Sequence, residues 1–220
     1  MKLLENISLK KYNTFGIHVT ARYFAEFTTI DELIALLDKA NGKQKLILGG
    51  GSNILFTKNV DGFVLKNDLK GIQLIKEDAH HFYVKAAAGE NWHRFVLYCI
   101  DNNLAGLENL SLIPGCTGAS PMQNIGAYGV EMKDVFDSLE AFHIKDKHAF
   151  TFSSNDCAFG YRESVFKRAL KNQFIITHVI YRLNKHPVFN TSYGAIEQEL
   201  EAMGVKELSI KAISDAVIVV

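Results

Sequence analysis

The sequence predicts an α+β protein, and two patterns of strands and helices point to that class. Residues 21–66 follow the pattern strand, helix, strand, strand. From residue 71 onward, paired runs of alternating apolar and polar residues are typical of antiparallel hairpins, with amphipathic helical segments between them. Residues 110–129 contain no charged side chain and are too broken by glycine and proline to form one regular element. Strands and helices grouped in this way favour an α+β arrangement.

In the first region, local signals define each element. Residues 21–27 predict a strand, and Thr28–Thr29 supply cap chemistry for a helix over residues 30–41. The short apolar run 44–50 predicts a buried strand, and the run 61–67 predicts another. We therefore expect a small mixed unit with one helix.

In the second region, residues 71–78 and 81–89 alternate like the two strands of a hairpin. Residues 91–103 place Trp92 and Phe95 on one stripe, which predicts a helix packed on that sheet. The remaining predicted elements are a hairpin of 138–145 with 148–154, a long central strand over 173–183, a helix over 192–204, and the start of a helix over 209–220.

Composition limits the possible functions. The chain has 220 residues, 48% of them hydrophobic, and its formal net charge is zero, so no basic face indicates nucleic acid or anionic lipid as a partner. Three cysteines far apart in the sequence indicate reduced thiols, and the histidines show no metal-ligand spacing. The first residues lack a signal-peptide core, and no run approaches the ~18 apolar residues of a membrane helix. We therefore expect a cytoplasmic protein without a metal site.

The segment 46–56, LILGGGSNILF, places three glycines directly after a strand. Glycine lets main-chain N–H groups approach an anion closely. A Walker loop is excluded because Gly-Lys-Ser/Thr is absent, and a Rossmann turn is excluded because Ile54 replaces the third glycine. We expect residues 54–56 to continue as a strand. Ser52 and Asn53 add donors that favour a diphosphate cradle, and a tight turn without a ligand is the alternative.

Residues 110–129 combine glycines that free the backbone with prolines that stiffen it. Small side chains, close main-chain donors and little water are what a flat heteroaromatic ring needs from its binding site. A wall of a ring-binding pocket is one interpretation. A buried loop whose glycines relieve crowding is the other.

Together these segments resemble one family, the UDP-N-acetylenolpyruvoylglucosamine reductases, or MurB flavoenzymes. The resemblance extends over almost the whole chain, in the family's order, and is most specific in residues 106–131 and 159–167. The matching segments are 12–17, 46–56, 86–96, 106–131, 159–167 and 191–196.

The resemblance implies the two-lobed FAD-binding fold of the vanillyl-alcohol-oxidase/PCMH type. It implies a small α+β lobe over 1–66, a larger antiparallel lobe over 67–190 with helices, and over 191–220 the start of a connection to a C-terminal substrate domain. FAD, bound non-covalently, would lie between the lobes. The implied cofactor residues are Leu48, Gly49, Gly50, Gly51, Ser52, Asn53, Ile54, Ile113, Pro114, Gly115, Gly118, Ala119, Ser120, Gln123, Asn124, Gly126 and Ile176.

The implied reaction is reduction of the enolpyruvyl ether of a UDP-sugar, with NADPH as co-substrate, in peptidoglycan synthesis. Arg162 matches the family's catalytic arginine, whose planar fork suits the substrate carboxylate. A surface arginine paired with Glu163 is the alternative. Tyr128 and Tyr193 match substrate-binding positions, and Tyr161 either contacts the substrate or packs. A monomer is expected.

The sequence departs from the family where the substrate is protonated. The family's serine and late glutamate have no counterpart here, so we expect a chain cut short that is inactive alone. A catalytically incomplete FAD-binding module is one alternative function. An oxidase of the same fold acting on another small molecule is a second, and oxygen reactivity of the reduced flavin would identify it.

Overall fold

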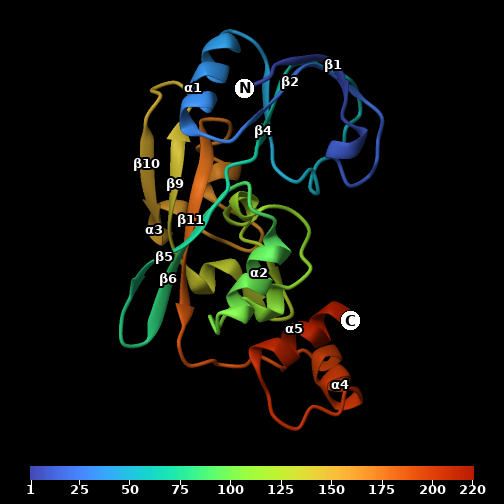
Figure 1. Ribbon diagram of the computed structural model, residues 1–220, viewed down its shortest axis with the longest axis vertical. Helices are drawn as coiled ribbons and strands as arrows, with labels where there is room; N and C mark the ends of the chain where they lie inside the picture. The colour runs from blue at the N-terminus through green and yellow to red at the C-terminus, as the bar shows by residue number, and fades with distance from the viewer.

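Two separate β-sheets organise the chain in the computed structural model, which describes residues 1–220 (Figure 1). The first sheet contains β1 (Leu4–Ser8), β2 (Thr20–Phe27), β3 (Lys45–Leu48) and β4 (Val60–Asn67), in the order β1-β2-β4-β3. β1 pairs antiparallel with β2, whereas β2 and β3 both pair parallel with β4. Helix α1 (Ile30–Lys39) connects β2 to β3 and covers one face of this sheet.

Helix α1 begins where the sequence predicts. The Thr29 side chain accepts a hydrogen bond from the Glu32 N–H, and the Glu32 carboxylate accepts from the Thr28 N–H in return. Leu33, Leu36 and Leu37 are buried on one face of the helix. This face packs on the first sheet, so the helix is stabilised by burial of an apolar stripe as well as by its cap.

The second sheet is antiparallel and has five strands. These are β5 (Ile72–Glu77), β6 (His81–Ala87), β9 (Phe136–His143), β10 (Ala149–Ser153) and β11 (Phe174–Asn184), in the order β10-β9-β11-β6-β5. β11 is the central strand, as the sequence predicts. Helix α2 (Trp92–Asp101) packs on this sheet through Trp92 and Phe95, whose rings contact the buried Tyr181 of β11.

The two sheets share part of their core. Ala87, Phe142 and Ile175 of the second sheet lie in the same cluster as Phe27 and Leu33 of the first region. The predicted division of the chain at residues 66 and 190 stays a prediction, but this shared core fixes one sheet against the other. A cofactor bound between the two sheets would therefore contact two walls whose relative position is fixed by this shared core.

The short elements connect the sheets and extend the molecule. A small hairpin is formed by β7 (Gly126–Ala127) and β8 (Val130–Glu131), and a single helical turn, α3 (Ser154–Cys157), follows β10. Helices α4 (Gly194–Ala202) and α5 (Ile210–Val219) pack on each other at the end of the molecule away from α1 (Figure 1). A hydrogen bond of 2.7 Å joins the hydroxyls of Ser111 and Ser214 and anchors α5 to the glycine-rich segment.

One prediction about local structure needs correction. Residues 54–56 do not continue as a strand, because β3 ends at Leu48 and the chain then turns at Gly51, where φ is +68°. Phe56 is then buried in the small core, and β4 begins only at Val60. The structure also contains a strand that the sequence did not predict, the short edge strand β1. Asn6 within this strand has a positive φ, so the strand is irregular. None of the helices has the length and apolar character needed to cross a bilayer.

Candidate functional site

A cavity of about 680 Å³ lies between the two sheets. One wall comes from the first sheet and the glycine turn, through Ile47, Gly49 and Asn67. The facing wall comes from Gly118 and from Ile176 of β11. A volume of this size is in the range of sites that enclose a cofactor or another organic ligand.

The glycine turn presents free main-chain donors. None of the N–H groups of residues 49–53 donates a hydrogen bond within the protein. The Ser52 hydroxyl instead donates to the Pro114 carbonyl at 3.0 Å, and the Asn53 amide donates to Gln123 at 3.1 Å. The turn is therefore tied to the segment after residue 110 by side chains while its main-chain donors remain available to an anionic ligand.

The glycines of the site have different structural roles. A Cβ on Gly51 would lie 2.0 Å from the Tyr12 carbonyl oxygen, and one on Gly118 would lie 2.4 Å from the Ala88 Cβ, so both positions need glycine for backbone packing. A Cβ on Gly50 would lie 3.1 Å from the Gly115 Cα. Only Gly49, which lines the cavity, has room for a Cβ, whose nearest neighbour would be Cys116 at 3.8 Å.

Residues 110–129, the charge-free segment, are held by main-chain hydrogen bonds to the loop before α2 and to the first residue of that helix. The Trp92 N–H donates to Gly115 at 3.0 Å, the Thr117 N–H to Glu90 at 2.9 Å, and the Gly118 N–H to Ala88 at 3.0 Å. Between residues 111 and 125, the regular structure of this segment is limited to two short 3-10 turns, at Thr117–Ala119 and Pro121–Gln123. The segment thus lies close against its neighbours and contributes small side chains to the cavity.

The structure brings only part of the predicted cofactor set to this cavity. Gly49, Gly118, Ala119 and Ile176 line it. Residues that were not among the predicted cofactor residues also line it. Leu46, Ile47 and Phe166 belong to the matching segments 46–56 and 159–167, whereas other lining residues lie outside every matching segment; these include Asn67, Ile144, Leu170 and Phe174. Cys116 is the only cysteine in the lining, which contains no histidine.

Two predicted cofactor residues have side chains that are used inside the protein. The buried Ser120 hydroxyl bonds to the Thr117 carbonyl at 2.7 Å and to the Tyr181 hydroxyl at 2.8 Å. The buried Asn124 side chain donates to Gly160 and accepts from the Lys133 N–H. Both side chains are therefore buried and already satisfied within the protein, and the cofactor role of these two residues stays a prediction. Leu48 likewise packs in the core of the first sheet.

A second cavity, of about 910 Å³, contains the predicted catalytic and substrate residues. Arg162, Tyr128, Tyr161 and Tyr193 all line it. The rings of Tyr128 and Tyr193 meet edge to face with their centroids 5.3 Å apart. The predicted cofactor residues Ile113 and Gly126 line this cavity and not the first. The tertiary structure therefore gathers segments that are far apart in the sequence around Arg162.

Arg162 is exposed, and its backbone adopts a left-handed conformation with φ of +53°. Its guanidinium donates a 2.6 Å hydrogen bond to the Gly126 carbonyl, and the Lys167 ammonium donates to the Arg162 carbonyl at 2.8 Å. Glu163 pairs with Arg168, so the alternative of an Arg162–Glu163 pair is not what the structure shows. Donors on the guanidinium remain for a carboxylate in the cavity.

The Glu131 carboxylate beside this cavity is held ionised. Glu131 lines it, and the hydrogen bond from Lys133 lowers the pKa of Glu131, with a smaller contribution from the charge of Arg162. Glu131 is paired with Lys133, and Arg162 forms no ion pair within the protein. No three His, Cys, Asp or Glu side chains gather in an arrangement that suits a metal ion.

The cavity between two lobes, the free donors of the glycine turn and the close-packed glycine segment define a protein that binds a dinucleotide cofactor. Residues 21–147 match the FAD binding domain family, and the chain belongs to that family. The unpaired donors at residues 49–53 and the adjoining cavity fit FAD, which is its cofactor.

The chain is also similar to particular enzymes, as the matching segments indicate. It is 53% identical over 220 residues to the UDP-N-acetylenolpyruvoylglucosamine reductase of Amoebophilus asiaticus, covering 99% of this chain and 65% of that protein. It is 50% identical over 222 residues to the reductase of the same name from Flavobacterium johnsoniae, covering 100% of this chain and 66% of that protein. The chain thus spans about two thirds of the length of these relatives.

Solved structures confirm the predicted fold. The crystal structure of UDP-N-acetylenolpyruvylglucosamine reductase (MurB) from Thermus caldophilus superposes with a TM-score of 0.68 at 23% identity, covering 99% of this chain and 66% of that one. A cholesterol oxidase from Brevibacterium sterolicum superposes with a TM-score of 0.59 at 15% identity, covering 83% of this chain and 38% of that one. The chain has the two-lobed FAD-binding fold of the vanillyl-alcohol-oxidase/PCMH type.

Proposed function

We propose that this chain provides the flavin site and part of the substrate site of a reductase that converts UDP-N-acetylglucosamine enolpyruvate to UDP-N-acetylmuramate with NADPH, in peptidoglycan synthesis. The names of the relatives support the substrate class. When bound, FAD supplies the hydride chemistry that side chains cannot provide. Because the chain spans 65% and 66% of the relatives named above, we assign the complete reaction to a protein of their full length.

The observation that carries this proposal is the position of Arg162. Its guanidinium lies in a cavity lined by Tyr128 and Tyr193, and a bond to the Gly126 carbonyl sets its direction. Reduction of an enolpyruvyl ether places negative charge on the substrate carboxylate and the carbon beside it. A planar fork that is already oriented stabilises that charge in the transition state more than in the ground state.

The tyrosines give the cavity the character of a nucleotide-sugar site. Tyr193 is 53% exposed and Tyr161 is 85% exposed, so both have surface to offer a ligand. Tyr128 has a positive φ of +49°, and its ring meets that of Tyr193 edge to face. Aromatic rings with a hydroxyl provide both stacking surface and hydrogen bonds to a uridine or sugar.

The test is a single-turnover experiment on the flavin-loaded chain. The bound flavin is reduced by light without oxygen and mixed with UDP-N-acetylglucosamine enolpyruvate at millimolar concentration, and flavin absorbance is followed. Reoxidation that depends on this substrate supports the proposal. Reoxidation by oxygen alone, at a rate typical of oxidases and without response to the substrate, would instead support the oxidase alternative.

For residues 1–220 alone we propose flavin binding with negligible steady-state turnover. Arg162 and its neighbours Tyr161 and Tyr193 are exposed, so bulk water competes with any fixed proton donor for the enolate. Consumption of NADPH driven by the enolpyruvyl substrate is the measurement. Turnover typical of full-length reductases would show that these residues contain the whole catalytic apparatus.

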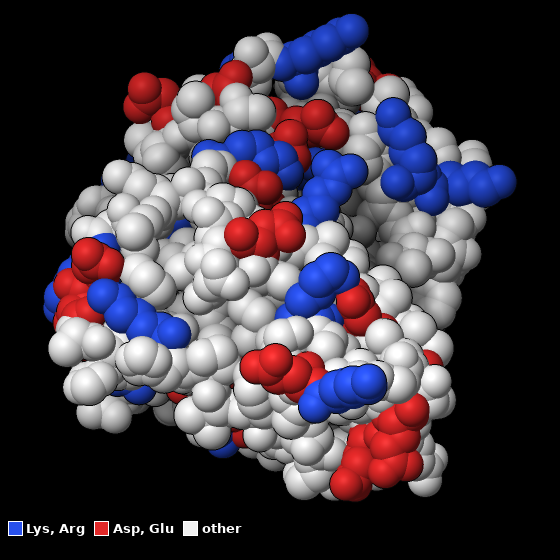
Figure 2. Space-filling model, turned by 60° about the horizontal axis from the view of Figure 1, so that its bottom comes forward, with Lys and Arg blue, Asp and Glu red and all other residues white.

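We propose a cytoplasmic monomer without nucleic-acid or membrane partners. The formal net charge is zero, and Figure 2 shows acidic and basic side chains interspersed over one face of the molecule, with no continuous basic surface there. Size-exclusion chromatography with light scattering would contradict the monomer if it gave twice the mass of 24.6 kDa.

A further inference from the structure

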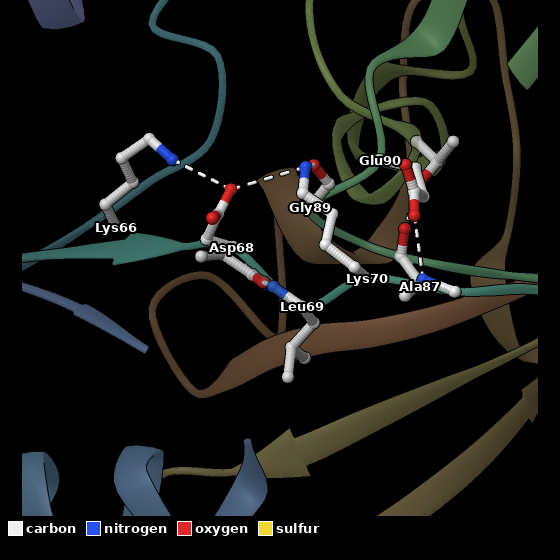
Figure 3. A network of polar contacts seen from close by, with 10 residues as sticks. Lys66, Asp68, Leu69, Lys70, Ala87, Gly89 and Glu90 are labelled. Carbon is white, nitrogen blue, oxygen red and sulfur yellow. Dashed lines mark hydrogen bonds and ion pairs between the residues drawn. The ribbon is translucent and has the colours of Figure 1, made fainter. Parts of the chain in front are cut away.

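Two lysines and an aspartate form a polar cluster where β4 ends, beside the glycine turn. The Asp68 carboxylate lies 3.1 Å from the Lys66 ammonium and 3.3 Å from the Lys70 ammonium (Figure 3). The Lys66 side chain is 22% exposed, and that of Asp68 is 31% exposed. Two positive charges therefore share one carboxylate, with Lys66 partly shielded and the Lys70 side chain 52% exposed.

Strand pairing places this cluster at the start of the glycine turn. Leu48 of β3 pairs with Lys66 of β4, and the next residues, Gly49 and Asn67, both line the cavity between the lobes. Side chains alternate along β4, so Lys66 lies on the same face as Val64 and opposite to Asn67, and it borders the glycine turn without lining the cavity. Val64 belongs to the core that also contains Phe56, so the chain after the turn folds over this face.

Backbone packing fixes the cluster against the second lobe. The Gly89 N–H donates to the Leu69 carbonyl at 3.1 Å, and the Lys70 ammonium donates to the Gly89 carbonyl. A Cβ on Gly89 would lie 2.6 Å from the Leu69 carbonyl oxygen, so the two segments are in direct contact. Ala88, the neighbour of Gly89, lines the cavity.

The charges nearby leave the two ammonium groups under-compensated. The Glu90 carboxylate accepts a 2.7 Å hydrogen bond from the Gly71 N–H, and neither lysine is paired with it. Burial raises the pKa of the Cys116 thiol, and the charges of Lys70 and Lys66 counteract this effect, which agrees with both lysines lying near the cavity. A diphosphate at the glycine turn would bring negative charge to this place, where main-chain donors alone supply only partial charges.

We propose that Lys66 and Lys70 are the side-chain counter-charges for the diphosphate of FAD, and that Asp68 holds them in place until the cofactor binds. This inference rests on the flavin site of the proposed function and is independent of the substrate. On binding, the diphosphate competes with Asp68 for the two ammonium groups. The cluster thereby selects a dinucleotide flavin over a flavin that lacks phosphate.

The test measures dissociation constants of FAD and of riboflavin, by flavin fluorescence, for the flavin-free 220-residue protein and its variants. Lys66→Met and Lys70→Met should each raise the dissociation constant for FAD about tenfold, since a charged hydrogen bond to phosphate is lost. Binding of riboflavin should not change. The Arg variants at both positions keep the charge and should retain FAD affinity. Lys185→Met, which removes a lysine paired with Glu77 away from the cavity, is the matched control.

Asp68→Asn separates a binding role from a structural one. If Asp68 competes with the diphosphate, its neutralisation should lower the dissociation constant for FAD. If the cluster only connects β4 to the second lobe, this variant should weaken FAD binding together with the two methionine variants. Raising NaCl from 50 to 500 mM provides a further measurement on wild type alone, because salt should weaken binding of FAD much more than of riboflavin.

The outcomes are separable. FAD binding by the lysine-to-methionine variants equal to that of wild type would overturn the inference, and so would equal weakening of FAD and riboflavin. Failure of the wild-type protein to bind FAD at all would instead contradict the flavin site itself. Should a methionine variant fail to fold in circular dichroism, the Asp68→Asn result and the salt dependence still decide the question.

Discussion

The guanidinium of Arg162 donates a 2.6 Å hydrogen bond to the main-chain carbonyl of Gly126, in the short strand that precedes Tyr128. This bond connects the loop between β10 and β11 to the charge-free segment, residues 110–129, and directs the arginine into the cavity that both segments line. The arginine is therefore oriented by the fold before any substrate arrives, which is the condition for strong transition-state stabilisation.

Arg162→Lys should slow substrate-dependent flavin reoxidation by about 10²–10³-fold, because lysine keeps the charge but loses the fork. FAD affinity should not change, since Arg162 does not line the first cavity. Stopped-flow mixing of the photoreduced protein with substrate, alongside an FAD titration, is the measurement. An unchanged rate would remove Arg162 from the proposed mechanism.

Gly49→Val should weaken FAD binding while the protein remains folded. The new side chain would extend into the cavity, and its Cβ would meet only Cys116 at an ordinary contact distance. Gly51→Ala is the contrasting variant, because its Cβ would lie 2.0 Å from the Tyr12 carbonyl at a φ of +68°. We expect it to lower the free energy of unfolding by at least about 1 kcal/mol. Urea unfolding and FAD titration of both variants would show whether binding and stability separate in this way.

Tyr181→Phe should lower the free energy of unfolding by about 1 kcal/mol, because the buried Ser120 hydroxyl loses one of its two partners. The ring would keep its packing against Phe95, so no cavity is created. Ser120→Ala and the double variant complete a cycle measured by urea unfolding. A coupling energy of zero would contradict a direct bond between the two hydroxyls.

Cys116 should report on cofactor binding through its reactivity. Burial raises the pKa of its thiol above the usual value, so at pH 8 the thiolate fraction is smaller than for a free cysteine. Alkylation by iodoacetamide should therefore be slow at pH 8 and should accelerate as the pH rises toward and beyond 9. Because Cys116 lines the first cavity, saturating FAD should protect it. Equal alkylation rates with and without FAD, measured by mass spectrometry, would place the flavin elsewhere.

Non-covalent attachment of FAD predicts that acid releases the flavin intact. The protein as purified should be yellow, with one flavin per chain, and the supernatant after acid precipitation should contain all of it. The lining of the first cavity contains no histidine to which a flavin could be linked. Flavin that stays with the precipitated protein would contradict this prediction.

The sequence by itself determined most of the local structure. The cap at Thr29 and the apolar stripe of residues 91–103 are short-range signals, and the two helices form where those signals occur. The resemblance carried by segments such as 106–131 and 159–167 also indicated the family and its cofactor before any contact was known, and the comparisons confirm both.

Only the tertiary structure decided which polar side chains remain free. Ser120 and Asn124 belong to the same segment as residues that line the cavities, but both are buried. Ser120 is bonded to Tyr181 and Asn124 to Gly160, and the spacing of residues in the sequence does not predict either partner. Tertiary contacts also explain two other positions. Residue 51 must be glycine because the Tyr12 carbonyl lies against it, and strand pairing places Lys66 next to Leu48, the residue before Gly49. A sequence motif shows which residue types a site needs. The hydrogen-bond partners of those residues and the space around them depend on which distant segments the fold brings into contact.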